Sequence, residues 1–258
     1  MPSMTEKAEY FRSLHVRGRP LVLFNIWDVG SAKAVESAGA RAIATGSWSV
    51  AKANGYEDGE KLPVDFAIDN LARIARATEL PVTIDLESGY GRRPDNVGRT
   101  VERSIEAGAV GCNLEDSDPA SGTLRDIAGQ VERIKHARKA AEGHRLPYFI
   151  NVRTDVFFVQ TQPQTDNEAK IAEVIERAQA YAEAGADGLF VPGLVDGPSI
   201  GRVVGATRLP LNIMFGDQAP PLRELASLGV ARVSHGPRPY LSMMAKLQEA
   251  AREAARLD

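Results

Sequence analysis

Two short patterns alternate along this chain, and they limit its fold more than any other feature. In the first, a proline precedes an apolar run with a polar end; its four copies cover residues 20–28, 81–87, 147–153 and 210–215. In the second, a small-residue helix end with a glycine leads into a short apolar strand; its four copies cover residues 38–45, 107–115, 184–191 and 228–234. Glycine is typical where a helix C-terminus needs a left-handed residue. Interleaved, the patterns predict eight strands.

The segments between these strands have the apolar spacing of helices, as in Phe66, Ile68, Leu71 and Ile74. The predicted helices are 29–38, 65–77, 95–107, 127–141, 166–184, 199–206, 220–228 and 239–255. Strands that alternate with helices form a parallel sheet, and eight such units in about 250 residues form a closed (β/α)8 barrel. We therefore expect residues 1–258 to form one TIM-barrel domain, with a doubly wound open sheet as the alternative.

The composition excludes several classes of protein. The formal net charge of −3 implies no strong attraction to nucleic acid or to an anionic membrane. No run approaches the roughly 18 apolar residues of a membrane helix, and the N-terminal residues lack the apolar core of a secretory signal. The single cysteine excludes an intrachain disulfide and suits a reducing compartment. We expect a cytoplasmic protein whose ligand is a small molecule.

The strand over residues 81–87 ends in two acids. Successive side chains of a strand point to opposite faces, so Asp85 and Glu87 are predicted to share one face with Thr83. Neighbouring carboxylates repel each other unless a cation or a proton joins them, and their hard oxygen atoms suit Mg²⁺ or Mn²⁺. The stretch predicts a metal-dependent active site; capping or bridging to arginines is the structural alternative.

Active sites of such barrels lie at the carboxyl ends of the strands. Polar residues predicted at those ends are Asn25, Thr45, Ser47, Asn113, Glu115, Asn151, Arg153, Asn212, Ser234 and His235. A barrel interior needs apolar layers for packing, so this density of polar groups indicates function. Arg153 is suited to binding a carboxylate or phosphonate in a bidentate manner, or it pairs with Asp155 or Glu115.

At these residues the chain resembles the isocitrate lyase and phosphoenolpyruvate mutase superfamily. The resemblance covers nearly the whole chain and rests on Gly46-Ser47, Asp58, Asp85-Leu86-Glu87-Ser88-Gly89-Tyr90-Gly91, Leu114-Glu115-Asp116 and Arg153-Thr154-Asp155. It implies an enzyme that makes or breaks a C–C or P–C bond next to a 2-oxo acid, with Mg²⁺ holding an enolate-like intermediate. It also implies a homo-oligomer, a dimer or tetramer, that often exchanges its last barrel helix, here 239–255.

The resemblance also implies roles for particular residues. Asp85 would bind the metal directly, while Glu87 and Glu115 would hold its water molecules. Gly46 and Ser47 would bind the substrate carboxylate and carbonyl, and Arg153 would neutralise the anionic end. Asp58, on the loop after the second strand, would act in acid–base chemistry or positioning, although Asp58-Gly59 is also a good turn pair. Trp48 at the rim and Asn212 at a strand end complete the predicted substrate contacts.

One segment departs from the superfamily. The lyase branch carries Lys-Lys-Cys-Gly-His after the fourth strand, with the cysteine as acid–base group, and the mutase branch uses a lysine and an asparagine there. Residues 116–126 of this chain contain no lysine, cysteine, histidine or asparagine. Residues 117–125, with Gly122, are a candidate lid, and Arg125 is a candidate source of positive charge.

Three functions remain open on the sequence. The first is a Mg²⁺-dependent lyase, decarboxylase, hydrolase or isomerase of a small 2-oxo acid. The second is a metal-dependent aldolase that condenses a pyruvate-type enolate with an aldehyde. The third, suggested by residues 116–126, is a non-catalytic barrel that binds a small acid.

Overall fold

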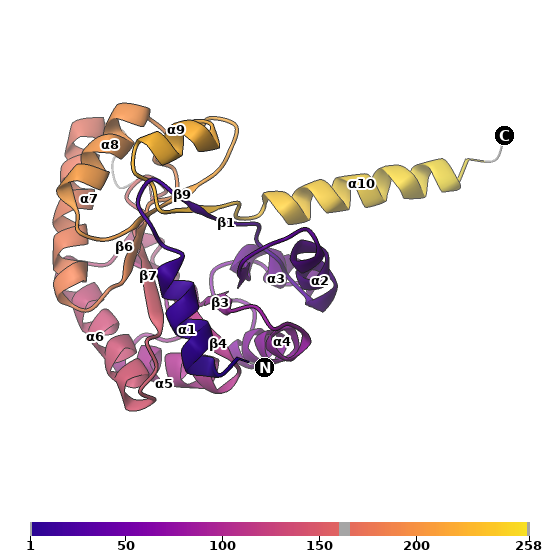
Figure 1. Ribbon diagram of the computed structural model, residues 1–258, viewed down its shortest axis with the longest axis horizontal. Helices are drawn as coiled ribbons and strands as arrows, with labels where there is room; N and C mark the ends of the chain where they lie inside the picture. Colours follow the sequence, from indigo (N-terminus) through magenta and orange to yellow (C-terminus); the bar gives the residue numbers. More distant parts are fainter. Residues whose placement is uncertain (1, 160–165, 257–258) are drawn as a thin grey trace.

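The computed structural model describes residues 2–159 and 166–256 and shows a (β/α)8 barrel (Figure 1). The wall formed by these residues consists of eight parallel strands: β1 (Leu21–Leu23), β2 (Ile43–Ala44), β3 (Val82–Asp85), β4 (Ala109–Glu115), β7 (Phe149–Arg153), β8 (Gly188–Phe190), β9 (Leu211–Met214) and β10 (Arg232–Ser234). Their order in the sheet is β1-β10-β9-β8-β7-β4-β3-β2. Beyond the ends of β1 and β2, Ile26 forms a parallel bridge to Thr45, which closes the circle. The predicted barrel is confirmed, and the open-sheet alternative is wrong.

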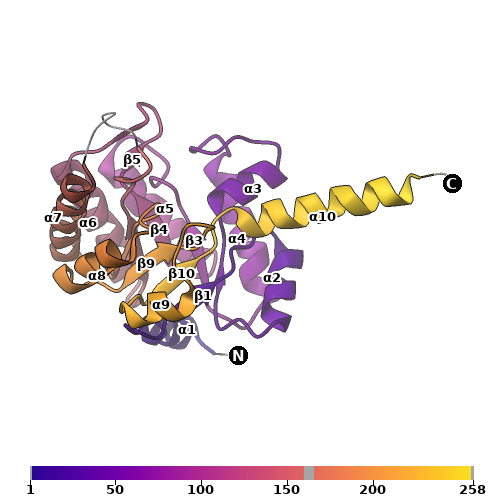
Figure 2. The same cartoon turned by 90° about the horizontal axis from the view of Figure 1, so that it is seen from above.

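Helices surround the strands (Figures 1 and 2). They are α1 (Met4–Ser13), α2 (Val29–Ser37), α3 (Ser47–Ala53), α4 (Val64–Ala77), α5 (Pro94–Glu106), α6 (Ile127–Gly143), α7 (Asn167–Glu183), α8 (Gly197–Ala206), α9 (Leu222–Ser227) and α10 (Arg238–Ala254). The eight predicted helices correspond to α2 and to α4 through α10, with ends that differ by a few residues. The patterns did not predict α1, α3 or the hairpin of β5 (Ser117–Asp118) and β6 (Thr123–Leu124).

Helix α1 packs against the amino-terminal ends of β4 and β7. Its buried Phe11 meets the ring of Phe149 edge-on at 5.7 Å, and His15 in the following turn stacks on the same ring at 3.9 Å. A Cβ atom at Gly111 would come within 3.2 Å of the Phe11 ring, so glycine makes this close packing possible. Burial lowers the pKa of His15 to about 3, so the imidazole is neutral at physiological pH. The N-terminal segment therefore covers the end of the barrel opposite the carboxyl ends of the strands.

Strand β3 ends two residues earlier than the pattern predicts. It stops at Asp85, and Glu87 has a left-handed φ of 51°. The alternation of strand side chains therefore does not place Glu87 beside Asp85. A turn places it there instead, because the Glu87 N–H donates to Asp85 Oδ1 at 3.4 Å.

Helix α10 leaves the barrel and projects outward (Figures 1 and 2). Pro239 is its one buried residue, while Leu241, Met243 and Leu247 are exposed. An open groove of about 620 Å³ runs beside strand β1, and the exposed Val22 and Phe24 line it. Within the described residues, no helix is both long and apolar enough to cross a membrane.

Candidate active site

A cavity of about 170 Å³ opens at the carboxyl ends of the strands. Six of the predicted site residues line it: Gly46, Ser47, Trp48, Asp58, Asp85 and Arg153. Other lining residues are Asn25, Ser49, Asn113, Phe158, Phe190, Pro192, Met214, Ser234, Gly236 and Pro237. The cavity therefore brings together six of the nine residues predicted for the site, whereas Asn25, Asn113 and Ser234 were predicted only as polar strand ends.

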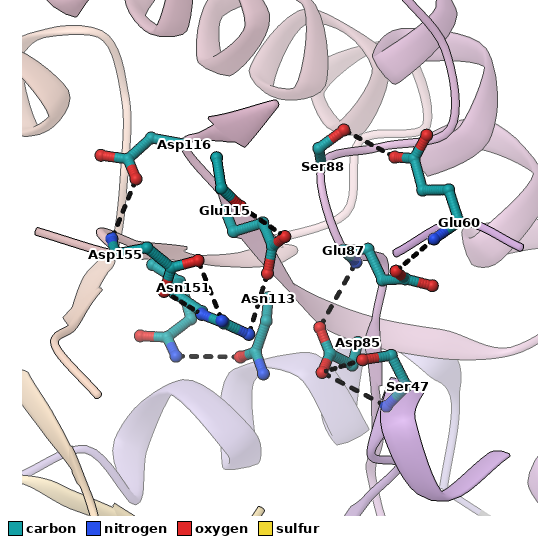
Figure 3. A network of polar contacts seen from close by, with 12 residues as sticks. Ser47, Glu60, Asp85, Glu87, Ser88, Asn113, Glu115, Asp116, Asn151 and Asp155 are labelled. Carbon is teal, nitrogen blue, oxygen red and sulfur yellow. Dashed lines mark hydrogen bonds and ion pairs between the residues drawn. The ribbon is translucent and has the colours of Figure 1, made fainter. Parts of the chain in front are cut away.

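Asp85 connects the end of β3 to the start of α3 (Figure 3). Its Oδ2 accepts hydrogen bonds from the Ser47 N–H at 3.3 Å and the Ser47 hydroxyl at 3.0 Å. Its own N–H donates to Thr45 Oγ1 at 3.0 Å. Ser47 is thus hydrogen-bonded to the carboxylate that is predicted to bind the metal, and both residues line the cavity.

Glu87 is buried in a set of contacts between two loops (Figure 3). Its Oε2 accepts the Glu60 N–H at 2.5 Å, and its Oε1 accepts the Tyr90 hydroxyl at 3.1 Å. Glu60 Oε1 in turn accepts the Ser88 hydroxyl at 2.6 Å and the Tyr90 N–H at 2.8 Å. These contacts hold the Asp58–Lys61 loop against the loop after β3.

Glu115 and Arg153 face each other from neighbouring strands, as their register predicts. Arg153 Nη1 lies 2.8 Å from Glu115 Oε2, and Nε and Nη2 donate to the two Asp155 carboxylate oxygens at 2.6 and 2.9 Å. The Ser117 hydroxyl donates to Glu115 Oε1 at 2.6 Å. The ion pairs of Arg153 with Asp155 and Glu115, considered above as the structural alternative, are therefore present. Arg153 nevertheless also lines the cavity.

Burial, and then repulsion between neighbouring carboxylates, raise the pKa values of the acids of the site. Burial, and then the charge of Asp58, raise the pKa of Glu87 to about 8. Burial raises the pKa of Glu115 to about 7, although the charge of Arg153 opposes this. Asp58 stands at the rim, where loss of contact with water and then the charge of Asp85 raise its pKa. Such a group of carboxylates favours a proton or a cation between its members.

The side chains of the described residues are not arranged to surround a metal ion on their own. Among residues 2–159 and 166–256, no three His, Cys, Asp or Glu side chains are placed to hold an ion together. Asp85 lines the cavity, whereas Glu87 and Glu115 lie outside its lining. The donors are all oxygen atoms, which is the ligand chemistry of Mg²⁺, an ion that keeps several water molecules and takes one or two carboxylates. The residues fit a hydrated ion better than a complete protein cage.

Two predicted substrate contacts have different surroundings. Trp48 lines the cavity and meets the ring of Tyr240 edge-on at 6.0 Å, so the start of α10 supports it. Asn212 is fully buried and lies outside the cavity lining. Its amide exchanges hydrogen bonds of 3.1 and 3.2 Å with the Ser234 hydroxyl. The structure therefore brings Ser234, rather than Asn212, to the cavity.

Two arginines support the loops beside the site, of which Arg125 was named from the sequence and Arg133 was not. Arg133, on α6, is 1% exposed, and its guanidinium donates to the carbonyl oxygens of Ser88, Gly91 and Arg92. Arg125 donates to the Ser117 carbonyl and lies 3.6 Å from Asp118, so it braces the β5–β6 hairpin and does not line the cavity. The contacts of Arg133 join residues more than 40 positions apart in the chain, whereas these two contacts of Arg125 stay within its own hairpin segment.

Comparison with known proteins identifies the family. Residues 11–255 match the family described as Phosphoenolpyruvate phosphomutase. The chain is 34% identical to an uncharacterised Mycobacterium tuberculosis protein, over 94% of this chain and 87% of the other. It is 30% identical to the 2-methylisocitrate lyase of Escherichia coli, over 81% of this chain and 70% of the lyase. An oxaloacetate decarboxylase of Bradyrhizobium is 32% identical over 64% of this chain and 54% of its own length.

Solved structures agree with this result. A Burkholderia cenocepacia protein, whose phosphonomutase name is provisional, superposes with a TM-score of 0.94 at 52% identity, over 98% of this chain and all of the other. Phosphonopyruvate hydrolase, solved with oxalate and Mg²⁺, shares the fold, with a TM-score of 0.83 at 22% identity over 95% of this chain and 86% of its own. The chain belongs to the phosphoenolpyruvate phosphomutase family. It is an enzyme of the lyase or phosphonomutase type.

Proposed function

We propose that the protein is a divalent-cation-dependent enzyme that cleaves or rearranges the C–C or P–C bond next to the carbonyl group of a small 2-oxo acid. The observation that carries the proposal is the cavity that Asp85 and Arg153 both line, flanked by acids whose pKa values are raised. An arginine and a cation-binding carboxylate in one cavity suit a substrate with an anionic end and a polarised carbonyl group.

The size of the cavity supports a small substrate. Its volume of about 170 Å³ is below the roughly 300–1,000 Å³ of pockets for drug-sized ligands. The named relatives agree in scale, because 2-methylisocitrate and oxaloacetate are small carboxylic acids. Arg153 keeps capacity for an anion, because a guanidinium has five N–H donors and its contacts with Asp155 and Glu115 use only some of them.

Asp85 would hold a hydrated Mg²⁺ or Mn²⁺, and Glu87 and Glu115 would accept hydrogen bonds from its water molecules. When bound, the cation would supply positive charge opposite the oxygen that becomes negative as the bond breaks. The raised pKa values of the two glutamates support this assignment, because a nearby cation would restore their ionised forms.

The remaining steps fall to side chains of the cavity. Ser47 and Gly46 would orient the carboxylate and carbonyl oxygens of the substrate beside Asp85. Asp58 would carry the proton that the carbon next to the carbonyl takes up after cleavage, because its raised pKa favours the protonated form. In oxaloacetate decarboxylation, for example, the electron pair of the broken C–C bond stays on that carbon, CO₂ leaves, and protonation gives pyruvate.

The test is release of pyruvate from oxaloacetate, phosphonopyruvate and 2-methylisocitrate, each with Mg²⁺ or with a chelator. We expect release from at least one substrate that needs the cation and falls at least about a hundredfold in Asp85→Ala. Asp69→Ala is the matched control, because Asp69 is an exposed acid on α4. Cation-independent release, or an Asp85→Ala variant as active as the control, would contradict the proposal. Condensation of pyruvate with an aldehyde, without any cleavage, would identify the aldolase instead.

A further inference from the structure

Arg232 is a buried cation in the interior of the barrel. It begins β10 and is 1% exposed, and within the described residues it forms no ion pair. Burial lowers its pKa to about 9, so the guanidinium is still charged at neutral pH. Its Nη2 donates to Asn113 Oδ1 at 3.2 Å, whereas Nε and Nη1 have no hydrogen-bond partner in the described structure.

This hydrogen bond crosses the full width of the barrel. In the order β1-β10-β9-β8-β7-β4-β3-β2, strands β10 and β4 stand opposite each other, with three strands between them on either side. Side chains on opposite strands can meet only through the interior. Arg232 therefore reaches beneath the cavity from one wall to the other, and it ends at Asn113, a residue of the cavity lining.

The contact fixes which way the Asn113 amide points. A guanidinium only donates hydrogen bonds, so Asn113 must present its oxygen to Arg232. The same Oδ1 accepts a second hydrogen bond, from Asn151 Nδ2 at 2.9 Å (Figure 3). Asn113 Nδ2 donates to no described residue. It is not among the fully buried polar atoms that lack a partner, so it is open to the cavity. With its oxygen held below, the amide offers its two N–H donors to the cavity.

The position of these donors suits an anion. Asn113 is in register with Asp85 on β3 and with Asn151 on β7, so it stands beside the carboxylate expected to bind the cation. We propose that Asn113 donates a hydrogen bond to a carboxylate or enolate-like oxygen of the substrate, and that Arg232 is the positioning residue that holds the amide in this orientation. The inference rests on the proposed function for the class of substrate, but binding of a small dianion tests it separately.

The first experiment compares oxalate binding to the wild type and to Asn113→Asp by calorimetry, with saturating Mg²⁺. Aspartate keeps an oxygen for Arg232 and Asn151 and replaces the cavity-facing donor by an acceptor. A purely structural role of Asn113 would be preserved, whereas loss of the donor predicts oxalate affinity lower by about ten- to a hundredfold. Thr83→Val is the matched control, because it removes a buried interior hydroxyl that has no partner, and it should bind oxalate as the wild type does.

The second experiment is a cycle of Asn113→Ala, Arg232→Met and the double variant. If Arg232 acts through Asn113, each single variant weakens oxalate binding by about tenfold or more and the double variant weakens it little further. Affinity for Mn²⁺ alone, measured by electron paramagnetic resonance, should stay within about threefold in Asn113→Ala, which separates the anion contact from collapse of the site. Thermal unfolding shows which variants are folded at the temperature of the assay.

Three results would overturn the inference. They are wild-type oxalate affinity in Asn113→Asp, losses that add fully in the double variant, and failure of the wild type to bind oxalate. Absence of turnover has a different meaning: if no substrate reacts but oxalate binding depends on Asn113, the proposed reaction is wrong and the anion contact stands. A crystal structure with Mg²⁺ and oxalate gives the direct reading, with Asn113 Nδ2 within about 3.2 Å of an oxalate oxygen.

Discussion

Glu87→Gln should make the protein more stable at neutral pH when no divalent cation is present. Glu87 is 3% exposed, and its pKa is about 8 in the folded protein against an ordinary value of 4.5. Above pH 4.5 the unfolded chain releases a proton that the folded protein retains. The contribution of Glu87 is therefore most favourable below pH 4.5 and is lost as the pH rises toward 8. Linkage between these two pKa values gives a loss of about 3 kcal/mol at pH 7.

Glutamine removes this titration while it preserves the contacts. Its amide oxygen can accept the Glu60 N–H, and its NH₂ group can donate to the Tyr90 hydroxyl, which rotates to accept. With chelator, we expect the variant to exceed the wild type in stability by about 1 kcal/mol at pH 5 and by about 3 kcal/mol at pH 7. For a chain of this length, that difference raises the melting temperature by about 6–12 °C.

Urea unfolding at pH 5, 6, 7 and 8, with chelator and with Mg²⁺, measures the effect. Mg²⁺ should stabilise the wild type more than the variant, because the cation offsets a charge that only the wild type carries. Parallel stability curves for the two proteins between pH 5 and 8 would refute the reasoning, since they would show that Glu87 has the same pKa in both states. Asp69→Asn is the surface control, because it makes the same acid-to-amide change at an exposed position of α4.

Three further predictions concern packing and assembly. Arg133→Met removes the donor to three carbonyls of the loop after β3 and should lower the free energy of unfolding by about 3 kcal/mol in urea; a loss below about 1 kcal/mol would contradict this. Gly111→Ala places a Cβ 2.7 Å from a backbone oxygen and should lower that free energy by about 2 kcal/mol, whereas a melting temperature equal to that of the wild type would show that β4 and β7 separate freely. Helix α10 of one copy should cover the exposed Val22 and Phe24 of another copy. Light scattering should therefore show a dimer or tetramer, and Leu247→Glu should dissociate it. A monomeric wild type at micromolar concentration would exclude the exchange.

The barrel could be predicted because its determinants are local. Each strand and most helices have their own apolar spacing, and the glycines mark the helix ends. Helix α1 was missed because Ala8 and Phe11 are its only buried residues, which is too weak a pattern to recognise. Helix α3 was missed because it has only seven residues and only two residues separate it from β2. In both cases tertiary packing, rather than local periodicity, accounts for the element.

The site could be predicted where strand ends determine it. Asp85, Glu115 and Arg153 follow from alternation and from the rule that barrel sites lie at the carboxyl ends of strands. Glu60 and Arg133 could not be found in this way, because they reach the site from a loop and from the outer face of the barrel. Arg232 was overlooked for a different reason. It shares the parity of Ser234, so the same alternation directs it inward, but an arginine at a strand start is usually solvated.

Most of the non-glycine residues with a left-handed backbone lie in the two loops beside the site, and their contacts show how these loops are held in position. The described residues include four non-glycine residues with a left-handed φ, and Glu60, Glu87 and Tyr90 are three of them. Each such conformation costs about 1–2 kcal/mol. Four hydrogen bonds among these residues and Ser88, with the buried Arg133 behind, offset that strain. Because the strained backbone and the hydrogen bonds belong to the same two loops, neither loop can relax without exposing the buried Glu87. The loop that carries Asp58 is therefore held over the cavity before any substrate binds.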